Sequence, residues 1–323
     1  MRCAAIDFGT NTARLLIGDC EERKLITLLV EREVVRLGGG FSDDYGLSNE
    51  AQKRGLDCLK RFSAIIREYG ACYIKASATS AVRDAVNGAS FVAQVKRETG
   101  IQLKVIDGDL EGRLTLNGVF SGIDVIHDDM MVLDVGGGST EITISEYGVP
   151  KFVRSLPLGV VRLTEGFGSS QSMYERIVTI INQLESEIVS NGISIKSETE
   201  LVSTAGTATT LAAIQMKMDK YDCGRVNNFI ISRKDVGLIY DMLLPMTPSE
   251  RLTVPGLEKG REDLIIAGIL ITIHVMDRFG FKRLKVSDYG LLEGLALSAA
   301  ESANSVNLCD NAPGSGELLV NAK

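Results

Sequence analysis

Residues 130–147 bring an acid, three glycines and two hydroxyl side chains together between an apolar segment and an alternating one. After the apolar segment the chain continues with Asp134, Val135, Gly136, Gly137, Gly138, Ser139, Thr140 and Glu141. Three glycines remove side chains from one spot, so that backbone N–H groups can converge on an anion. Asp134 ends a buried strand beside this turn, where it can meet the hard cation that accompanies phosphate. The stretch predicts a hairpin turn that binds phosphate and metal.

The same arrangement recurs at two other places in the chain. Near the N-terminus an apolar strand ends in an acid and continues into a turn of small and polar residues, with Asp7, Gly9, Thr10 and Asn11. A third version, at residues 201–210, lacks the acid but carries Gly206 and Thr207. Any one of these turns is explained as an ordinary hairpin, whereas three in this order indicate a shared ligand. As a set they resemble the phosphate-binding parts of the actin-like superfamily of sugar kinases, actins and heat-shock chaperones.

The length and composition of the chain limit the classes of protein to which it can belong. A chain of 323 residues, 45% apolar and 24% charged, is long enough for two globular domains. The net charge of −7 argues against nucleic acid as a partner, and it requires a local basic cluster for any polyanionic substrate. Six cysteines without a C-x-x-C pair, with only two histidines, argue against zinc and fit a reducing compartment. No segment has the pattern of a signal peptide or a membrane span, so we expect a cytoplasmic protein with no membrane partner.

Alternating strands and helices must position the three turns, which predicts an α/β fold with mixed sheets. Ser48 predicts the N-cap of a helix that ends near Tyr69. Residues 107–113 are expected to be a loop that leads into the next helix. The chain divides into a first domain at 1–123, a second domain at 124–303 that closes with a helix at 289–303, and a loose tail at 304–323.

Further short motifs extend the resemblance beyond the three turns. The matching segments are 6–16, 78–85, 111–113, 133–141, 155–163 and 205–207. Together they resemble the exopolyphosphatase / guanosine pentaphosphate phosphohydrolase (Ppx/GppA) family, in its short form without a C-terminal HD-type domain. The resemblance implies two actin-like (ribonuclease H-like) domains with an active-site cleft between them.

The resemblance also implies a reaction, in which water attacks the terminal phosphate of a phosphoanhydride chain with the assistance of Mg²⁺ or Mn²⁺. Glu111 is then the candidate base that activates water, and Arg83 is a bidentate donor to the terminal phosphate. Asp134, Glu141 and Asp7 are the candidate metal ligands. The candidate phosphate-binding residues are Gly9, Thr10, Asn11, Gly137, Gly138, Ser139, Gly206 and Thr207.

Simpler roles compete for three of these residues. Glu111 has the position of a helix-start carboxylate that the helix dipole favours. Arg83 is next to Asp84 and could form a surface salt bridge with it. Glu141 could pair across the strands of its hairpin.

Several functions also remain open at this point. Inorganic polyphosphate is the first expected substrate, and guanosine pentaphosphate is the alternative that the same residues would serve. A kinase on this fold would require a second recognition motif, which we do not find, and would avoid a water-activating glutamate. A sensor that binds guanosine polyphosphates or ATP without turnover is a further alternative. A homodimer is left open.

Overall fold

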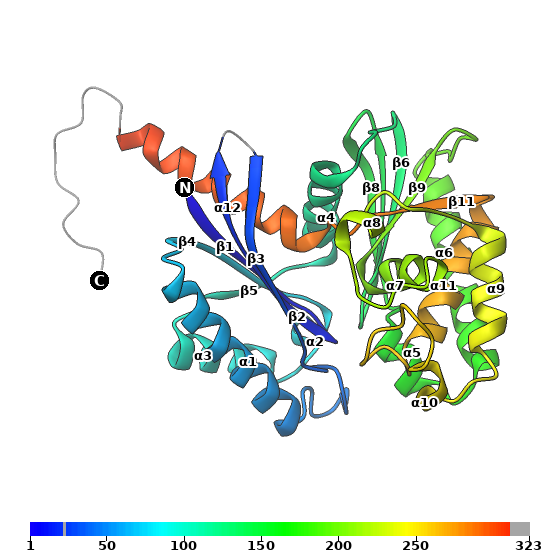
Figure 1. The fold of residues 1–323 in the computed structure, drawn as a ribbon, viewed down its shortest axis with the longest axis horizontal. Coiled ribbons are helices and arrows are strands. Elements are labelled where there is room, and N and C mark those ends of the chain that lie inside the picture. Colours follow the sequence, from blue (N-terminus) through cyan, green and yellow to red (C-terminus); the bar gives the residue numbers. More distant parts are fainter. Residues whose placement is uncertain (22–23, 311–323) are drawn as a thin grey trace.

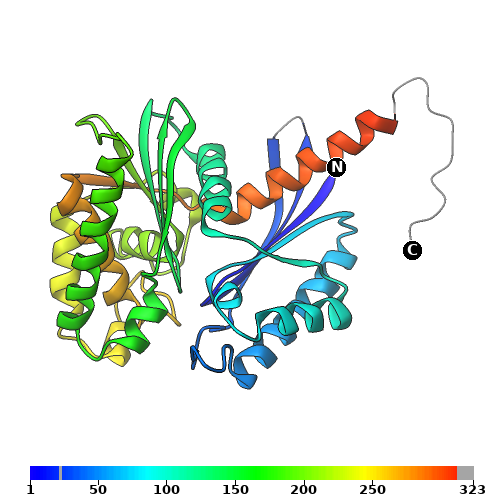
Figure 2. The same ribbon diagram turned by 180° about the vertical axis from the view of Figure 1, so that it is seen from behind.

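The computed structural model describes residues 1–21 and 24–310, which form two lobes, each a mixed sheet with helices packed on it (Figure 1). The lobes lie side by side and are joined by two helices that run between them, as the reverse view also shows (Figure 2). None of the helices within these described ranges has the length and apolarity needed to cross a membrane.

The first lobe is a five-stranded sheet in the order β3-β2-β1-β4-β5. Its strands are β1 (Arg2–Phe8), β2 (Thr12–Glu21), β3 (Lys24–Val34), β4 (Tyr73–Ala78) and β5 (Leu103–Val105). Its helices are α1 (Asn49–Glu68), α2 (Ser80–Arg83) and α3 (Gly88–Thr99). Helix α1 begins as predicted, because the Ser48 hydroxyl accepts a hydrogen bond from the Ala51 N–H at 3.3 Å.

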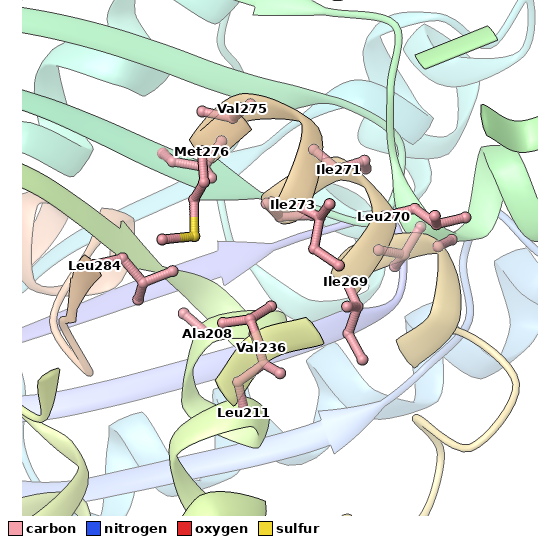
Figure 3. Packing of buried hydrophobic residues seen from close by; sticks show 14 of the residues in the cluster. Ala208, Leu211, Val236, Ile269, Leu270, Ile271, Ile273, Val275, Met276 and Leu284 are labelled. Carbon is pink, nitrogen blue, oxygen red and sulfur yellow. The ribbon is translucent and has the colours of Figure 1, made fainter. Parts of the chain in front are cut away.

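The second lobe is a six-stranded sheet in the order β10-β11-β9-β6-β7-β8. Its strands are β6 (Asp129–Val135), β7 (Thr140–Glu146), β8 (Val149–Leu156), β9 (Glu200–Thr204), β10 (Ile230–Ser232) and β11 (Arg283–Val286). Its helices are α5 (Val160–Gly166), α6 (Ser170–Ser190), α7 (Ala205–Gln215), α8 (Cys223–Val226), α9 (Arg233–Leu243), α10 (Pro248–Arg251) and α11 (Ile265–Phe279). The almost wholly apolar helix α11 fills the core beneath this sheet, where Ile269 and Met276 pack with Leu211, Val236 and Leu284 (Figure 3).

The two sheets repeat one pattern at their centres. Strand β1 pairs antiparallel with β2 and parallel with β4, and β6 pairs antiparallel with β7 and parallel with β9. Within the hairpins Asp7 lies opposite Arg14, and Asp134 lies opposite Glu141. The duplicated strand–Asp–Gly turn of the sequence is therefore a structural duplication, with one copy at the centre of each lobe.

The last helix of each half of the chain packs on the sheet of the other half. Helix α4 (Gly108–Gly122) follows the first sheet but packs on β7 and β8, whereas α12 (Leu291–Asp310) follows the second sheet but packs on β1, β2 and β4. The helices cross where a Cβ on Gly118 would lie 1.8 Å from the Gly290 carbonyl oxygen, and one on Gly294 would lie 1.9 Å from the Leu114 oxygen. Only glycine permits this close crossing.

The end of the chain corrects one expectation. The prediction placed the end of the last helix at residue 303 and a loose tail from 304. Helix α12 instead continues to Asp310, so residues 304–310 are helical. Residues 311–323 lie outside the described part. The domain boundary at 123 stays a prediction.

The helix crossing gives a stability prediction. We expect Gly118→Ala to destabilise the protein by about 1–3 kcal/mol, because the new methyl group must displace backbone atoms of α12. Thermal unfolding measures this change. Gly237→Ala in α9 is the matched control, since its Cβ would meet only the flexible Arg233 guanidinium, at 3.0 Å. A control variant that loses as much stability as Gly118→Ala would contradict the role of the crossing.

Candidate active site

A cleft of about 680 Å³ lies between the lobes and is lined by residues of both. All the predicted site residues line it except Arg83 and Glu141. Those that do are Asp7, Gly9, Thr10, Asn11, Glu111, Asp134, Gly137, Gly138, Ser139, Gly206 and Thr207. The structure therefore brings the three turns of the sequence, far apart along the chain, to one place.

The first two turns touch each other directly. A Cβ on Gly137 would lie 2.9 Å from the Thr10 Cβ, and one on Gly138 would lie 2.7 Å from the Thr10 hydroxyl oxygen. Thr10 Oγ1 and Asn11 Oδ1 are buried at the cleft wall and have no hydrogen-bond partner among the described residues. Since buried polar groups are nearly always paired, these two atoms indicate a polar ligand, such as phosphate with its ordered water.

The third turn starts helix α7 and is covered by an arginine. Ala205 has a positive φ of 62°, a strained conformation for a residue with a side chain. A Cβ on Gly206 would lie 1.4 Å from Arg261 Nη1, so the glycine makes room for this guanidinium. Burial lowers the pKa of Arg261 to about 10, and Glu258 holds its Nε at 3.2 Å. Gly206 thus leaves room for a positive charge over the third turn.

Glu111 lies in the first turn of helix α4, not in a loop as predicted, and its side chain is only 8% exposed. Helix α4 lies against the second sheet because a Cβ on Gly112 would be 2.6 Å from Val153 Cγ1. Arg83 Nη1 of the first lobe donates to Glu111 Oε2 at 3.1 Å and to the Ile106 carbonyl at 3.0 Å. The pair therefore spans the two lobes, with Glu111 lining the cleft and Arg83 behind it in contact with Glu111.

Burial raises the pKa of Glu111 well above its ordinary value, and the charges of Glu141 and Asp134 raise it further. Arg83 opposes this rise. A carboxylate with a raised pKa is a stronger proton acceptor than an ordinary one, which is what the activation of water requires. The sequence predicted a loop around Glu111, whereas its burial among other acids strengthens the case for a chemical role.

Three further carboxylates gather around the first two turns. Burial raises the pKa of Asp7 to about 7, against the opposing charge of Arg14. Burial likewise raises the pKa of Asp134 to about 6, although a hydrogen bond from Thr115 at 3.3 Å lowers it. Burial and then the charge of Asp134 raise the pKa of Glu141 to about 7. Negative charge in this cluster exceeds what the neighbouring arginines neutralise.

This excess negative charge is what a divalent cation would relieve. No three acidic, histidine or cysteine side chains among the described residues converge closely enough to enclose a metal by themselves. Mg²⁺ does not need such a cage, because it commonly binds one or two carboxylates and completes its shell with water and substrate phosphate. Asp134 and Asp7 line the cleft, whereas Glu141 does not line it and accepts from Ser155 Oγ at 2.6 Å. The residues present fit the binding of Mg²⁺ together with phosphate.

The raised pKa values predict how stability depends on pH. Acids that are harder to ionise in the folded state lose stabilisation as pH rises through their folded pKa values of about 6 and 7. We expect the metal-free protein to melt at a lower temperature at pH 8 than at pH 5.5. Mg²⁺ should reverse the loss, and Asp7→Asn should make the slope smaller. A melting temperature independent of pH in chelator would contradict the buried acid cluster.

The sequence did not identify the basic residues that the cleft needs for a polyanion. Arg14, Arg32, Lys259 and Arg261 line the cleft. They come from β2, β3 and the segment before α11, so no local cluster of charge marks them in the sequence. The alternation of β2 could have placed Arg14 next to Asp7, but nothing in the sequence signals Arg261.

Comparison with known proteins agrees with this geometry. The model of the Ppx/GppA phosphatase family matches residues 16–303. The chain is 33% identical over 316 residues to a bifunctional 3-dehydroquinate synthase/phosphatase of Fusobacterium nucleatum, of which it spans 46%, about half the length. It is 31% identical to exopolyphosphatase 2 of Mycobacterium tuberculosis, with 93% of this chain and 98% of the relative covered. A guanosine-5'-triphosphate,3'-diphosphate pyrophosphatase of Aeromonas hydrophila is 25% identical, with 98% of this chain and 62% of the relative covered.

Solved structures agree with the family model. An exopolyphosphatase from Cytophaga hutchinsonii superposes with a TM-score of 0.84 at 30% identity, covering 93% of this chain and 98% of that one. A Ppx/GppA family member from Aquifex aeolicus gives a TM-score of 0.79 at 28% identity, covering 94% and 99%. The predicted fold of two actin-like α/β domains and the predicted class of enzyme, a phosphoanhydride hydrolase, are confirmed. The chain belongs to the Ppx/GppA phosphatase family.

Proposed function

We propose that the protein is an exopolyphosphatase, which removes the terminal phosphate of inorganic polyphosphate. The observation that carries the proposal is the buried Glu111 carboxylate, which faces a cleft between two contacting Gly turns and is held at 3.1 Å by Arg83. A relative named exopolyphosphatase is covered over 98% of its length by this chain, so the comparison involves the whole of that protein.

The chemistry requires a base at one end of the phosphate chain. A water oxygen attacks the terminal phosphorus, the new P–O bond forms and the bridging P–O bond breaks. The proton of the water passes to a Glu111 carboxylate oxygen, and the shortened chain leaves as the anion. Arg83 keeps Glu111 oriented and offers its remaining N–H groups to the terminal phosphate.

The Gly turns and the cleft arginines bind the rest of the polyphosphate. The unpartnered Thr10 Oγ1, together with the backbone N–H groups around Ser139, faces the terminal phosphates. Arg261, over the Gly206 turn, and Arg32 neutralise the phosphates further along the cleft. This arrangement supplies the local positive charge that a protein with a net charge of −7 otherwise lacks.

We further propose that Mg²⁺ binds with the substrate. Asp134 would hold it from the cleft wall, and Asp7 and Glu141 would hold its water shell. When bound, the cation supplies neutralisation of the charge on the phosphate oxygens. Mn²⁺ is an alternative with the same preference for oxygen ligands.

Guanosine pentaphosphate is the second candidate substrate. A relative named for activity on a guanosine polyphosphate supports it. The cleft also contains a polar corner, where the Tyr221 hydroxyl donates to the Asp288 carboxylate. Such a hydroxyl–carboxylate pair is suited to the polar edge of a nucleoside, although polyphosphate would not use it.

One comparison separates these functions. Phosphate release is measured side by side from tripolyphosphate, long-chain polyphosphate and guanosine pentaphosphate, each with Mg²⁺ and with chelator. We expect the fastest release from polyphosphate and none in chelator. Faster release from guanosine pentaphosphate would assign the nucleotide, and binding of either compound without release would indicate the sensor.

A further inference from the structure

Segment 159–162, which no function discussed above uses, packs against the outer side of the Gly136–Gly138 turn. Three successive carbonyls of the turn accept hydrogen bonds from it: Gly136 O from Val160 N at 3.0 Å, Gly137 O from Val161 N at 2.8 Å, and Gly138 O from Arg162 Nε at 2.9 Å. A Cβ on Gly159 would lie 2.3 Å from the Gly137 oxygen, so the segment lies flat against the turn. Every carbonyl of the turn is thus held from one side.

The direction of the carbonyls fixes the direction of the neighbouring N–H groups. In a trans peptide the C=O and the following N–H point in opposite directions. With the Gly138 carbonyl held by Arg162, the Ser139 N–H points to the opposite side of the same peptide, and Ser139 lines the cleft. Glycine gives a peptide little resistance to rotation, so the restraint must come from outside the turn.

Arg162 also reaches the first lobe. Its Nη2 donates to Asp84 Oδ2 at 2.6 Å, and Asp84 directly follows helix α2, which ends at Arg83. Arg83 in turn contacts Glu111 at 3.1 Å. One guanidinium therefore joins the Gly136–Gly138 turn of the second lobe to the segment of the first lobe that carries Arg83.

We propose that Arg162 is a positioning residue, whose guanidinium holds the Gly138–Ser139 peptide with its N–H toward the bound phosphate while Asp84 orients that guanidinium across the lobes. The proposal rests on the proposed function only in that the ligand is a phosphate anion. Donors oriented in advance bind an anion more tightly than donors that must first reorganise.

If Arg162 only stabilised the fold, its loss would lower the melting temperature and leave phosphate affinity unchanged. The Arg162 and Asp84 side chains are 36% and 37% exposed, and an ion pair this exposed contributes little to folding. Loss of Arg162 should therefore change phosphate affinity far more than melting temperature. The matched control is Arg233, which forms a two-point pair with Asp277 at 2.7 and 2.8 Å and does not line the cleft.

The experiment measures binding of imidodiphosphate, a non-hydrolysable analogue, by calorimetry with Mg²⁺, beside the melting temperature. We expect Arg162→Ala to weaken binding about tenfold or more, the effect of losing a hydrogen bond from a charged donor. Ethylguanidinium at low concentration should restore part of the affinity. Arg233→Ala should bind normally and melt at a similar temperature to Arg162→Ala.

Asp84 tests the link between the lobes. Asp84→Asn should weaken binding less than Arg162→Ala, and most of its effect should disappear in the Arg162→Ala background, because Asp84 contacts the Arg162 guanidinium at 2.6 Å and that of Arg83 only at 3.6 Å. If Arg162→Ala does not fold, Arg162→Lys replaces it in the experiment. Arg162→Lys should also bind imidodiphosphate more weakly, because one ammonium cannot contact the Gly138 carbonyl and Asp84 in the way that the planar guanidinium does.

Normal imidodiphosphate affinity in a folded Arg162 variant would overturn the proposal, as would additive effects of the two variants. A wild-type protein that binds imidodiphosphate but hydrolyses no phosphoanhydride would overturn the proposed function and leave the role of Arg162 standing. A wild-type protein that does not bind it would overturn both.

Discussion

Glu111→Gln should lower kcat by about 10²–10⁴ with little change in KM, the usual contribution of a general base. Glutamine keeps the size of the side chain and can still accept from Arg83, but it cannot take a proton from water. The turns and the cleft arginines are unchanged, so polyphosphate should bind as before. A loss confined to kcat marks an interaction that matters in the transition state. Steady-state release of phosphate from tripolyphosphate measures both constants.

Asp109→Asn is the matched control for Glu111. It lies in the same first turn of α4 but is exposed, and it pairs with Arg113 at 2.7 Å. If the helix dipole were the whole reason for an acid in this turn, both variants would lose a little stability and both would keep a normal kcat. A near-normal kcat in Glu111→Gln would remove Glu111 from the mechanism.

Asp134→Asn should remove most of the turnover, lowering kcat by about a hundredfold or more, because the substrate loses several kcal/mol of charge stabilisation from the metal. The variant should also lose the rise in melting temperature that Mg²⁺ causes at pH 8. This second measurement does not depend on turnover, so it separates loss of metal binding from loss of chemistry.

Asp129→Asn is the control on the same strand. Asp129 begins β6 and pairs with Lys196 at 2.9 Å, away from the cleft. It should keep full activity and the full response to Mg²⁺. Unchanged activity in chelator, or a normal response to Mg²⁺ in Asp134→Asn, would contradict the metal site.

The sequence by itself determined the duplicated turns, and it predicted the kind of ligand that they bind. Asp7 and Asp134 each end an apolar strand before small residues, and both the strand and the turn are local patterns that a short window of sequence reveals. The helix at Ser48 was likewise predictable, because an N-cap acts on the N–H groups of the next turn. The loop predicted at 107–113 was wrong because Asp107 caps a helix that starts at once, with its side chain accepting from the Leu110 N–H at 2.8 Å.

Only the tertiary structure decided how the charges around those turns are arranged. Glu111 on helix α4 acquires its raised pKa from burial beside acids of strands β6 and β7. Arg261 reaches Gly206 from 55 positions along the chain, the difference between their residue numbers. Arg162 meets Asp84 only because the lobes close on each other. Electrostatic energy depends on distance and on exclusion of water, and neither is a property of neighbouring residues in the sequence.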